Sequence, residues 1–287
     1  MIQDIYPHRL ANQYDPSAKP SLGSRIVVYR EGRILLRVNR ESGLMEFPKW
    51  RELGCPENTV YLFSLDDAPF FLVLPGEGRP FADITLEVIL GDGLEFYNLR
   101  DIRRWGLQPR ELVFAAFTAL QLAEWYERTV FCGKCGAPMG NSETERARVC
   151  PVCGTTIYPR INPAVIVGVK NGDKLLITRY KGARSMNALV AGFTEIGETL
   201  EETVAREVME ETGVKVKNIR YYKSQPWGIA SDILAGFYCE VDGDPRIRID
   251  ESELKYAEWV PREEIGLQPQ DYSLTNEMMQ RFKEGKE

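Results

Sequence analysis

The stretch at residues 192–214 constrains the fold of this chain more than any other, because it specifies a helix at both ends. It reads GFTEIGETLEETVAREVMEETGV. Thr199 is followed three residues later by Glu202, and this capping-box pattern predicts a helix that begins just after Thr199. Gly213 can take the left-handed conformation that ends a helix. We therefore expect a helix over residues 200–212.

One face of this expected helix carries three carboxylates. Glu207, Glu210 and Glu211 lie at positions i, i+3 and i+4, so their side chains gather on the same side. Two unit charges about 5 Å apart repel by roughly 3 kcal/mol at an effective dielectric near 20. Divalent cations reverse the sign of this energy, and oxygen ligands favour Mg²⁺ or Mn²⁺. Arg206 is placed to fix one glutamate by a charge-assisted hydrogen bond. The alternative is a solvated acidic face without a metal.

Four of the six cysteines form two pairs, and each pair lies in a glycine-bearing turn. The pairs read CGKCG and CPVCG, and fourteen residues separate them. A glycine after the second cysteine permits the tight turn that lets both thiolates face one ion. Four thiolates suit tetrahedral Zn²⁺, and a closed shell of protein ligands is structural rather than catalytic. We predict one structural zinc ion held by Cys132, Cys135, Cys150 and Cys153.

The composition limits the class of function. The formal net charge is −6, which argues against a protein whose main task is to hold duplex nucleic acid. The N-terminus lacks the pattern of a secretory leader, and no apolar run approaches the roughly 18 residues of a membrane span. We therefore expect a cytoplasmic protein without a membrane partner. His8 is the one histidine, so carboxylates are the expected bases.

Changes of pattern along the chain suggest three parts. Short apolar runs between Gly, Pro and Asp residues, the last of them ITLEVIL at 84–90, indicate a small antiparallel β domain. Apolar residues at helical spacing behind Pro109 predict one buried helix over 109–127. Hairpin and strand patterns, with a C-terminal helix in TNEMMQRFKEGKE, follow the cysteines. We expect a β-rich N-terminal domain at 1–128, a zinc ribbon at 129–157 and a catalytic domain at 158–287.

The complete spacing of the 192–214 stretch matches the Nudix box at every specified position. Gly192 is followed after five residues by Glu198, and after seven more by Arg206-Glu207 and the Glu210-Glu211 pair. The chain therefore resembles the Nudix hydrolases, which cleave a nucleoside diphosphate linked to another moiety. The resemblance implies an α/β/α sandwich with a mixed sheet, an α+β fold.

The resemblance narrows to one Nudix family. A four-cysteine ribbon directly before the box domain, joined to it by YPRINPAVIV, is similar to the NADH pyrophosphatase family. That family's fold implies a Nudix-like N-terminal domain, and its activity implies Mg²⁺- or Mn²⁺-dependent hydrolysis of NAD(H) to NMN(H) and AMP. Removal of NAD caps from RNA breaks the same bond. The resemblance also suggests a homodimer.

Site residues follow from the resemblance position by position. The backbone carbonyl of Ala191 and the carboxylate of Glu253 match further metal ligands, and Glu210 or Glu253 is the expected base for the attacking water. Phe193 matches an aromatic residue that stacks on a substrate ring. Further substrate-binding candidates are Tyr158, Glu145 and either Arg100 or Arg103.

A second signature of the family, SQPWPFPxS, is tied to NAD(H) selectivity. Here Ser224, Gln225, Pro226 and Trp227 match, and the segment then continues as GIASD. The loop lacks an aromatic residue and two prolines, each of which would fix a φ angle. This departure leaves open a Nudix hydrolase for another dinucleotide, of the ADP-ribose or coenzyme A type. A non-catalytic nucleic-acid-binding regulator that uses Arg146 and Arg148 of the ribbon is the other alternative.

Overall fold

The computed structural model describes residues 1–76, 93–181 and 186–287, and these residues form two compact units. One unit comprises Met1, 161–227 and 231–287, and the other comprises 2–160 and 228–230. The strand expected at 84–90 lies outside the described residues. The three-part division expected from the sequence remains a prediction.

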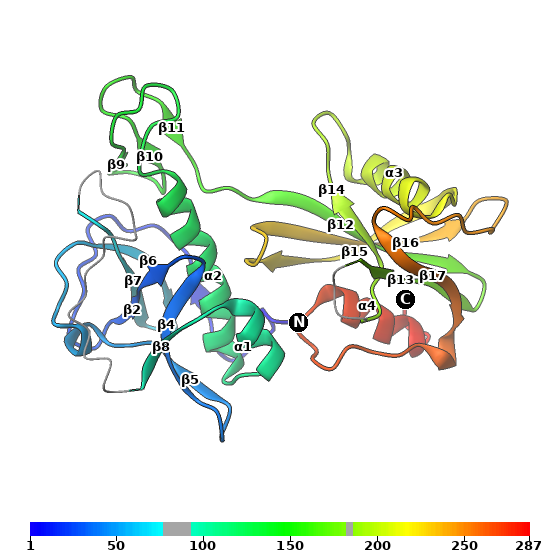
Figure 1. Ribbon diagram of the computed structural model, residues 1–287, viewed down its shortest axis with the longest axis horizontal. Coiled ribbons are helices and arrows are strands. Elements are labelled where there is room, and N and C mark those ends of the chain that lie inside the picture. The colour runs from blue at the N-terminus through cyan, green and yellow to red at the C-terminus, as the bar shows by residue number, and fades with distance from the viewer. Residues whose placement is uncertain (77–92, 182–185) are drawn as a thin grey trace. The chain divides into compact units, whose positions relative to one another are not determined.

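The unit at 161–287 is built on a mixed sheet (Figure 1). Among the described residues its strand order is β15-β16-β12-β13-β17, and β14 also pairs with β12. The pair β12–β16 is parallel and the other pairs are antiparallel. The strands are β12 (Asn162–Asn171), β13 (Lys174–Tyr180), β14 (Val190–Phe193), β15 (Val216–Trp227), β16 (Asp232–Val241) and β17 (Leu254–Pro261).

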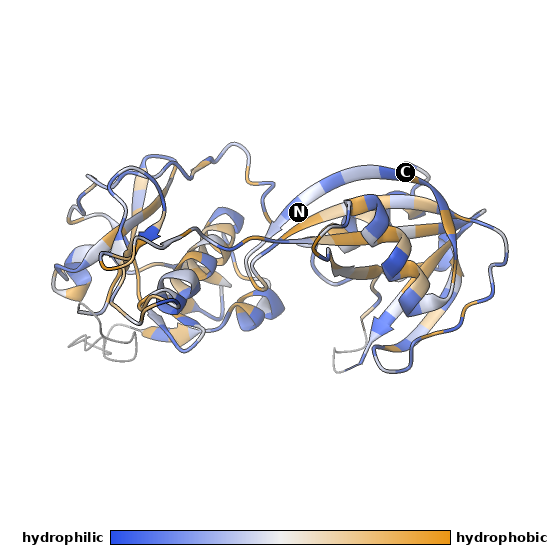
Figure 2. Cartoon of the chain, turned by 90° about the horizontal axis from the view of Figure 1, so that it is seen from above, coloured by the Kyte–Doolittle hydropathy of each residue, from blue (hydrophilic) through white to orange (hydrophobic). Residues whose placement is uncertain are grey.

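Helices cover both faces of this sheet, which gives the expected α/β/α sandwich. Helix α3 (Leu200–Thr212) packs through Val204 and Val208 on one apolar layer, and α4 (Leu274–Lys283) packs through Met278 and Phe282 on the other. A short 3-10 helix, Arg262–Glu264, precedes α4. Strand β12 reads as an almost continuous apolar run because both of its faces are buried. Figure 2 shows hydrophobic residues concentrated along the strands of the sheet.

The unit at 2–160 carries two four-stranded sheets within the described ranges. One has the order β1-β6-β7-β2, in which β2 and β7 are parallel, so the prediction of a purely antiparallel domain is wrong. In the other, β4 pairs with β3, β5 and β8. The strands are β1 (Leu10–Ala11), β2 (Arg25–Val27), β3 (Tyr29–Arg30), β4 (Arg33–Asn39), β5 (Leu44–Glu46), β6 (Thr59–Leu65), β7 (Ala68–Val73) and β8 (Leu94–Tyr97).

Helix α2 (Arg110–Arg128) is the predicted buried helix, and its inward face is apolar. Pro109 is its N-cap rather than its first helical residue. The shorter α1 (Leu99–Trp105) precedes it, and a 3-10 turn spans Trp50–Leu53. Beyond α2 the chain forms a small three-stranded sheet of β9 (Gly140–Asn141), β10 (Arg148–Val149) and β11 (Thr156–Ile157). No helix in the described ranges is long and apolar enough to cross a membrane.

Candidate functional site

The ends of α3 are set by the residues that the sequence indicated. The Thr199 hydroxyl accepts a hydrogen bond from the Glu202 N–H at 3.2 Å, and the Glu202 carboxylate accepts one from the Thr199 N–H at 2.8 Å. Gly213 ends the helix with a φ of 69°. The helix therefore covers Leu200–Thr212, as predicted, and the box glutamates occupy fixed positions on its surface.

The three glutamates of α3 differ in exposure. Glu207 and Glu211 are buried, with 9% and 1% of their surface exposed, whereas the Glu210 side chain is 59% exposed. Burial is the first cause that raises the pKa of both inner carboxyl groups, to about 8 for Glu211. The charge of Glu253 also raises both pKa values, so Glu253 lies close enough to act on them. A divalent cation would favour the ionised form of these groups, and carboxylate oxygens are the ligand type that Mg²⁺ and Mn²⁺ prefer.

The glycine of the box makes room for one of these carboxylates. Strand β14 places Gly192 beside α3, and a Cβ atom at this position would overlap the Glu207 carboxyl group. No other residue type leaves that volume free. The Gly192–Glu207 spacing in the sequence thus reflects a direct contact in the fold.

Arg206 links four groups of the site. Its guanidinium donates to both oxygens of Glu198 at 2.6 and 2.9 Å, to Glu207 at 2.8 Å and to Glu210 at 3.0 Å. It also donates to the Phe193 carbonyl at 2.9 Å, which ties β14 to α3. Because of the Arg206 hydrogen bonds, the pKa of Glu198 falls to about 2. Arg206 therefore holds Glu207 and Glu210 in place, while the Glu198 carboxylate balances its charge.

Tyr180, at the end of β13, is a site residue that the sequence analysis missed. Its hydroxyl lies 2.9 and 3.0 Å from the two carboxylate oxygens of Glu211 and accepts a hydrogen bond from the Ala191 N–H at 2.9 Å. Burial raises its pKa, so the phenol remains protonated. No local motif marks Tyr180, because its partners lie 11 and 31 residues away.

The signature residues 224–227 lie at the end of β15, and some are buried in the fold while others are accessible. Gln225 is fully buried, its amide donates to the Tyr272 carbonyl at 2.7 Å, and its oxygen accepts from the Leu274 N–H at 2.7 Å. Gln225 therefore anchors the start of α4 instead of offering its amide to a substrate. Ser224 and Trp227 are half-buried, and Pro226 is exposed.

Asp232, where the family signature ends in serine, is a second residue that the sequence analysis did not single out. It is 6% exposed, and its Oδ1 has no hydrogen-bond partner. Burial raises its pKa, and a side-chain hydrogen bond with Asn162 lowers it. Phe193, also in this unit, is 52% exposed, as a stacking platform requires. Ala191 lies on β14, two residues before Phe193, and is half-buried.

Other predicted substrate residues lie in the unit at 2–160. The Tyr158 hydroxyl donates to the Glu145 carboxylate at 2.9 Å, so these two independently predicted residues form a pair. Tyr158 is 57% exposed. On α1, Arg100 is exposed and Arg103 is half-buried.

The four predicted zinc ligands converge. Their sulfur atoms all lie within 4.8 Å of one another, with 3.6 Å between the sulfurs of Cys132 and Cys153 and 3.5 Å between those of Cys135 and Cys150. A tetrahedron with Zn–S bonds of about 2.3 Å has edges of about 3.8 Å. A disulfide would need about 2.05 Å. Gly136 follows one pair with a φ of 75°, and the second pair has an equivalent glycine. The centre is a structural zinc site.

The two arginines of the ribbon serve the fold. Arg148 is buried and bonds to the carbonyls of Met139 and Thr129 and to the Asn141 side chain. Arg146 donates to the Leu62 carbonyl and lies over the Tyr14 ring. The hypothesis that these arginines bind nucleic acid is therefore weakened, because internal acceptors bind Arg148 and the Nη2 atom of Arg146.

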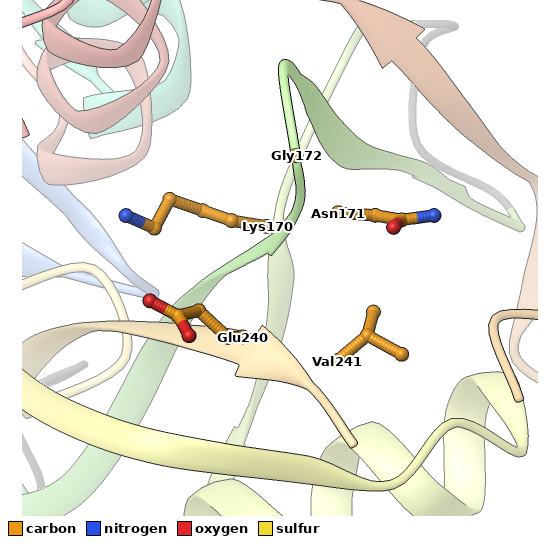
Figure 3. Close-up of a pocket in the computed structure, with 5 residues that line it drawn as sticks. All are labelled: Lys170, Asn171, Gly172, Glu240 and Val241. Atoms are coloured by element: carbon orange, nitrogen blue, oxygen red, sulfur yellow. The ribbon is translucent and has the colours of Figure 1, made fainter. Parts of the chain in front are cut away.

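The described cavities do not coincide with the carboxylates. A hollow of about 280 Å³ is lined by Lys170, Asn171, Gly172, Glu240 and Val241, and Figure 3 shows the Lys170 and Glu240 side chains extending to the same side of it. A second, of about 190 Å³, lies along β13 and β17 around Arg179 and Tyr256. Neither hollow is lined by a residue of α3. The candidate site is therefore identified from the carboxylates of α3 and their partners, not from a cavity.

Comparison with known proteins agrees with this arrangement. The NUDIX domain family matches residues 160–282, and the NADH pyrophosphatase zinc ribbon domain matches residues 127–158. A protein named NAD-capped RNA hydrolase NudC from Salmonella heidelberg (strain SL476) is 41% identical over 174 residues, which cover 60% of this chain and 67% of that protein. Its namesake from Salmonella schwarzengrund (strain CVM19633) is 42% identical over 175 residues, with the same two coverages.

Solved structures include a NUDIX hydrolase from Nitrosomonas europaea. It is 25% identical, has a TM-score of 0.48, and the match covers 54% of this chain and 90% of that one.

Proposed function

Because this chain belongs to the Nudix hydrolases that carry an NADH pyrophosphatase zinc ribbon, we propose that it hydrolyses the pyrophosphate bond of NAD(H) to NMN(H) and AMP. The same bond joins an NAD cap to RNA, so cap removal belongs to the proposal. The observation that carries it is the carboxylate set of α3, in which Glu207 and Glu211 are buried beside Arg206.

The cation site is part of the proposal. Mg²⁺ or Mn²⁺, held by Glu207, Glu210, Glu211, Glu253 and the Ala191 carbonyl, would neutralise charge on the diphosphate and lower the pKa of a water molecule. The unfavourable burial of two carboxylates in the protein alone supports this assignment, since cations compensate it.

The remaining proposed roles are proton transfer, orientation of the glutamates and contact with the substrate. Glu210, which points outward, or Glu253 accepts the proton of the attacking water. Arg206 keeps Glu207 and Glu210 oriented through its bonds of 2.8 and 3.0 Å. The exposed ring of Phe193 offers a stacking surface to a base or nicotinamide ring. Tyr158 with Glu145, one of Arg100 and Arg103, and the loop residues Ser224, Pro226 and Trp227 remain proposed substrate contacts.

A second candidate substrate class is another dinucleotide, such as ADP-ribose or a coenzyme A compound. Asp232 favours it, because a buried carboxylate stands where the signature tied to NAD(H) selectivity has serine. The binding-regulator alternative is weakened, since Arg146 and Arg148 are bonded internally.

We further propose a homodimer in the cytoplasm. The family resemblance supports the dimer, and the four thiols of the zinc ribbon suit a reducing compartment. Light scattering coupled to size-exclusion chromatography measures the mass, and a monomer at micromolar concentration would contradict the dimer.

Product analysis by liquid chromatography tests the activity. The purified protein is incubated with Mg²⁺ or Mn²⁺ and, separately, NADH, NAD⁺, ADP-ribose, a diadenosine compound, coenzyme A and NAD-capped RNA. We expect AMP and NMNH, fastest from NADH, and no product with Glu207→Gln. Faster cleavage of another compound would support pyrophosphate hydrolysis with a different substrate. No cleavage of any compound would refute the proposal.

A further inference from the structure

We propose that Tyr180 is a positioning residue that sets the separation between two proposed cation ligands, the Glu211 carboxylate on α3 and the backbone of Ala191 on β14. The inference rests on the proposed function, because it takes Glu211 and Ala191 as parts of the cation site.

The hydrogen-bond geometry gives the phenol group a defined direction. The Ala191 N–H donates to the phenol oxygen at 2.9 Å. The single O–H proton of Tyr180 then has four acceptors within reach, and the Glu211 oxygens at 2.9 and 3.0 Å are nearer than the carbonyls of Ala191 and Leu189 at 3.3 and 3.5 Å. A bound cation would keep Glu211 ionised, and an ionised carboxylate is a stronger acceptor than a carbonyl. Tyr180 therefore receives from β14 and donates to α3.

The connected groups belong to three different elements. Tyr180 ends β13, Ala191 lies in β14 and Glu211 is near the end of α3. Glu211 is 1% exposed, so water does not substitute for the phenol. A partner that holds a metal ligand in place commonly changes metal affinity about 10–100-fold when it is removed. We expect an effect of that size from loss of the Tyr180 hydroxyl.

The same strand supplies a matched control. Thr178 lies two residues before Tyr180 on β13 and is fully buried, and its hydroxyl has no hydrogen-bond partner among the described residues. Thr178→Val removes a hydroxyl from the same strand at nearly constant volume. It breaks no bond to either proposed ligand.

Direct Mn²⁺ binding tests the inference without a substrate. The full-length protein is titrated with Mn²⁺, and electron paramagnetic resonance measures the free ion. Tyr180→Phe is expected to weaken binding about 10–100-fold, and Thr178→Val to leave it within about twofold. In kinetics, the Mn²⁺ concentration at half-maximal rate should rise for Tyr180→Phe while the KM for the dinucleotide changes little.

A second variant distinguishes loss of the hydrogen bond from a packing defect left by the missing hydroxyl. 4-Fluorophenylalanine at position 180 fills the volume of the hydroxyl but cannot donate, so it should weaken Mn²⁺ binding as Tyr180→Phe does. In a Glu211→Gln background, removal of the hydroxyl should have no further effect, since the two groups act as a pair.

The outcomes separate the two proposals. Wild-type Mn²⁺ affinity in the fluorinated variant, or equal losses for Tyr180→Phe and Thr178→Val, overturns the role of Tyr180. If wild-type protein binds Mn²⁺, loses affinity with Tyr180→Phe and cleaves no dinucleotide, the inference stands and the proposed function falls.

Discussion

At the scale of the residue, contacts within the site determine which amino acid can occupy a given position. Position 192 requires glycine because the Glu207 carboxyl group occupies the space that a Cβ atom would need. Position 206 requires arginine because its guanidinium donates hydrogen bonds to four residues, which lie in β14, α3 and the loop before α3. Each residue is thereby specified by a partner in another segment of the chain.

Gly192→Ala should impair catalysis without unfolding the protein. The new methyl group would displace the Glu207 carboxylate, and a misplacement of about 1 Å can lower turnover roughly 100-fold. Steady-state kinetics with circular dichroism measures both effects. Gly23→Ala is the control, because a Cβ at Gly23 meets no atom within 4 Å. Unchanged turnover in Gly192→Ala would show that Glu207 does not depend on this space.

The buried Glu211 should make the stability of the metal-free protein depend on pH. Its pKa is raised from 4.5 to about 8, so between these values the folded state binds more protons than the unfolded state. The free energy of unfolding therefore falls as pH rises through this window, by at most about 1.4 kcal/mol per unit. Urea unfolding between pH 5 and 8 should show a smaller slope for Glu211→Gln. Parallel curves for the two proteins would contradict the assignment.

At the scale of the element, α3 and the signature loop illustrate two kinds of constraint. The helix is delimited locally, by Thr199, Glu202 and Gly213. The loop is constrained by packing, because a Cβ at Gly228 would overlap the backbone carbonyl of Phe117 in α2. Gly228 belongs to the same compact unit as α2. The Phe117 backbone thus leaves no space for a side chain at this position of the signature.

Gly228→Pro should therefore destabilise the protein, although it restores a residue of the family signature. A side chain forced against a helix backbone typically costs about 1–3 kcal/mol, and Gly228→Ala should show most of this cost. Thermal unfolding is the measurement, with Gly23→Ala again as the reference. An unchanged Tm for both substitutions at Gly228 would show that the loop adjusts freely.

At the scale of the whole molecule, the zinc ribbon is part of the compact unit at 2–160. Arg146 reaches the carbonyl of Leu62, and Arg148 reaches that of Thr129 just beyond α2. Zinc therefore stabilises the surface of this unit, whereas the mixed sheet at 161–287 has its own two apolar layers.

Cys150→Ser should release zinc and unfold the ribbon. The thiolate shell supplies the folding energy that a segment of this size lacks. Hydrogen exchange should increase at 132–157, while the strands β12 to β17 keep their protection. Cys55→Ser is the matched control, because Cys55 lies outside the sulfur cluster. Retention of one zinc per chain by Cys150→Ser would refute the four-thiolate site.

The sequence by itself determined the features that depend on local spacing. The limits of α3 follow from its caps, and the zinc ligands follow from the two cysteine knuckles. The hairpin expected after the cysteines forms between β12 and β13, with Gly172 and Asp173 in its turn and a φ of 62° at Gly172. These patterns involve residues a few positions apart, so backbone geometry links them directly.

Only the tertiary structure decided which polar groups meet. Tyr180 and Glu211 are 31 residues apart, Gly228 and Phe117 more than 100, and no periodicity joins such pairs. The parallel pairing of β2 with β7 and the internal use of Arg146 depend likewise on long-range packing. Burial and hydrogen-bond satisfaction act between surfaces brought together by the whole fold, and spacing along the chain does not record them.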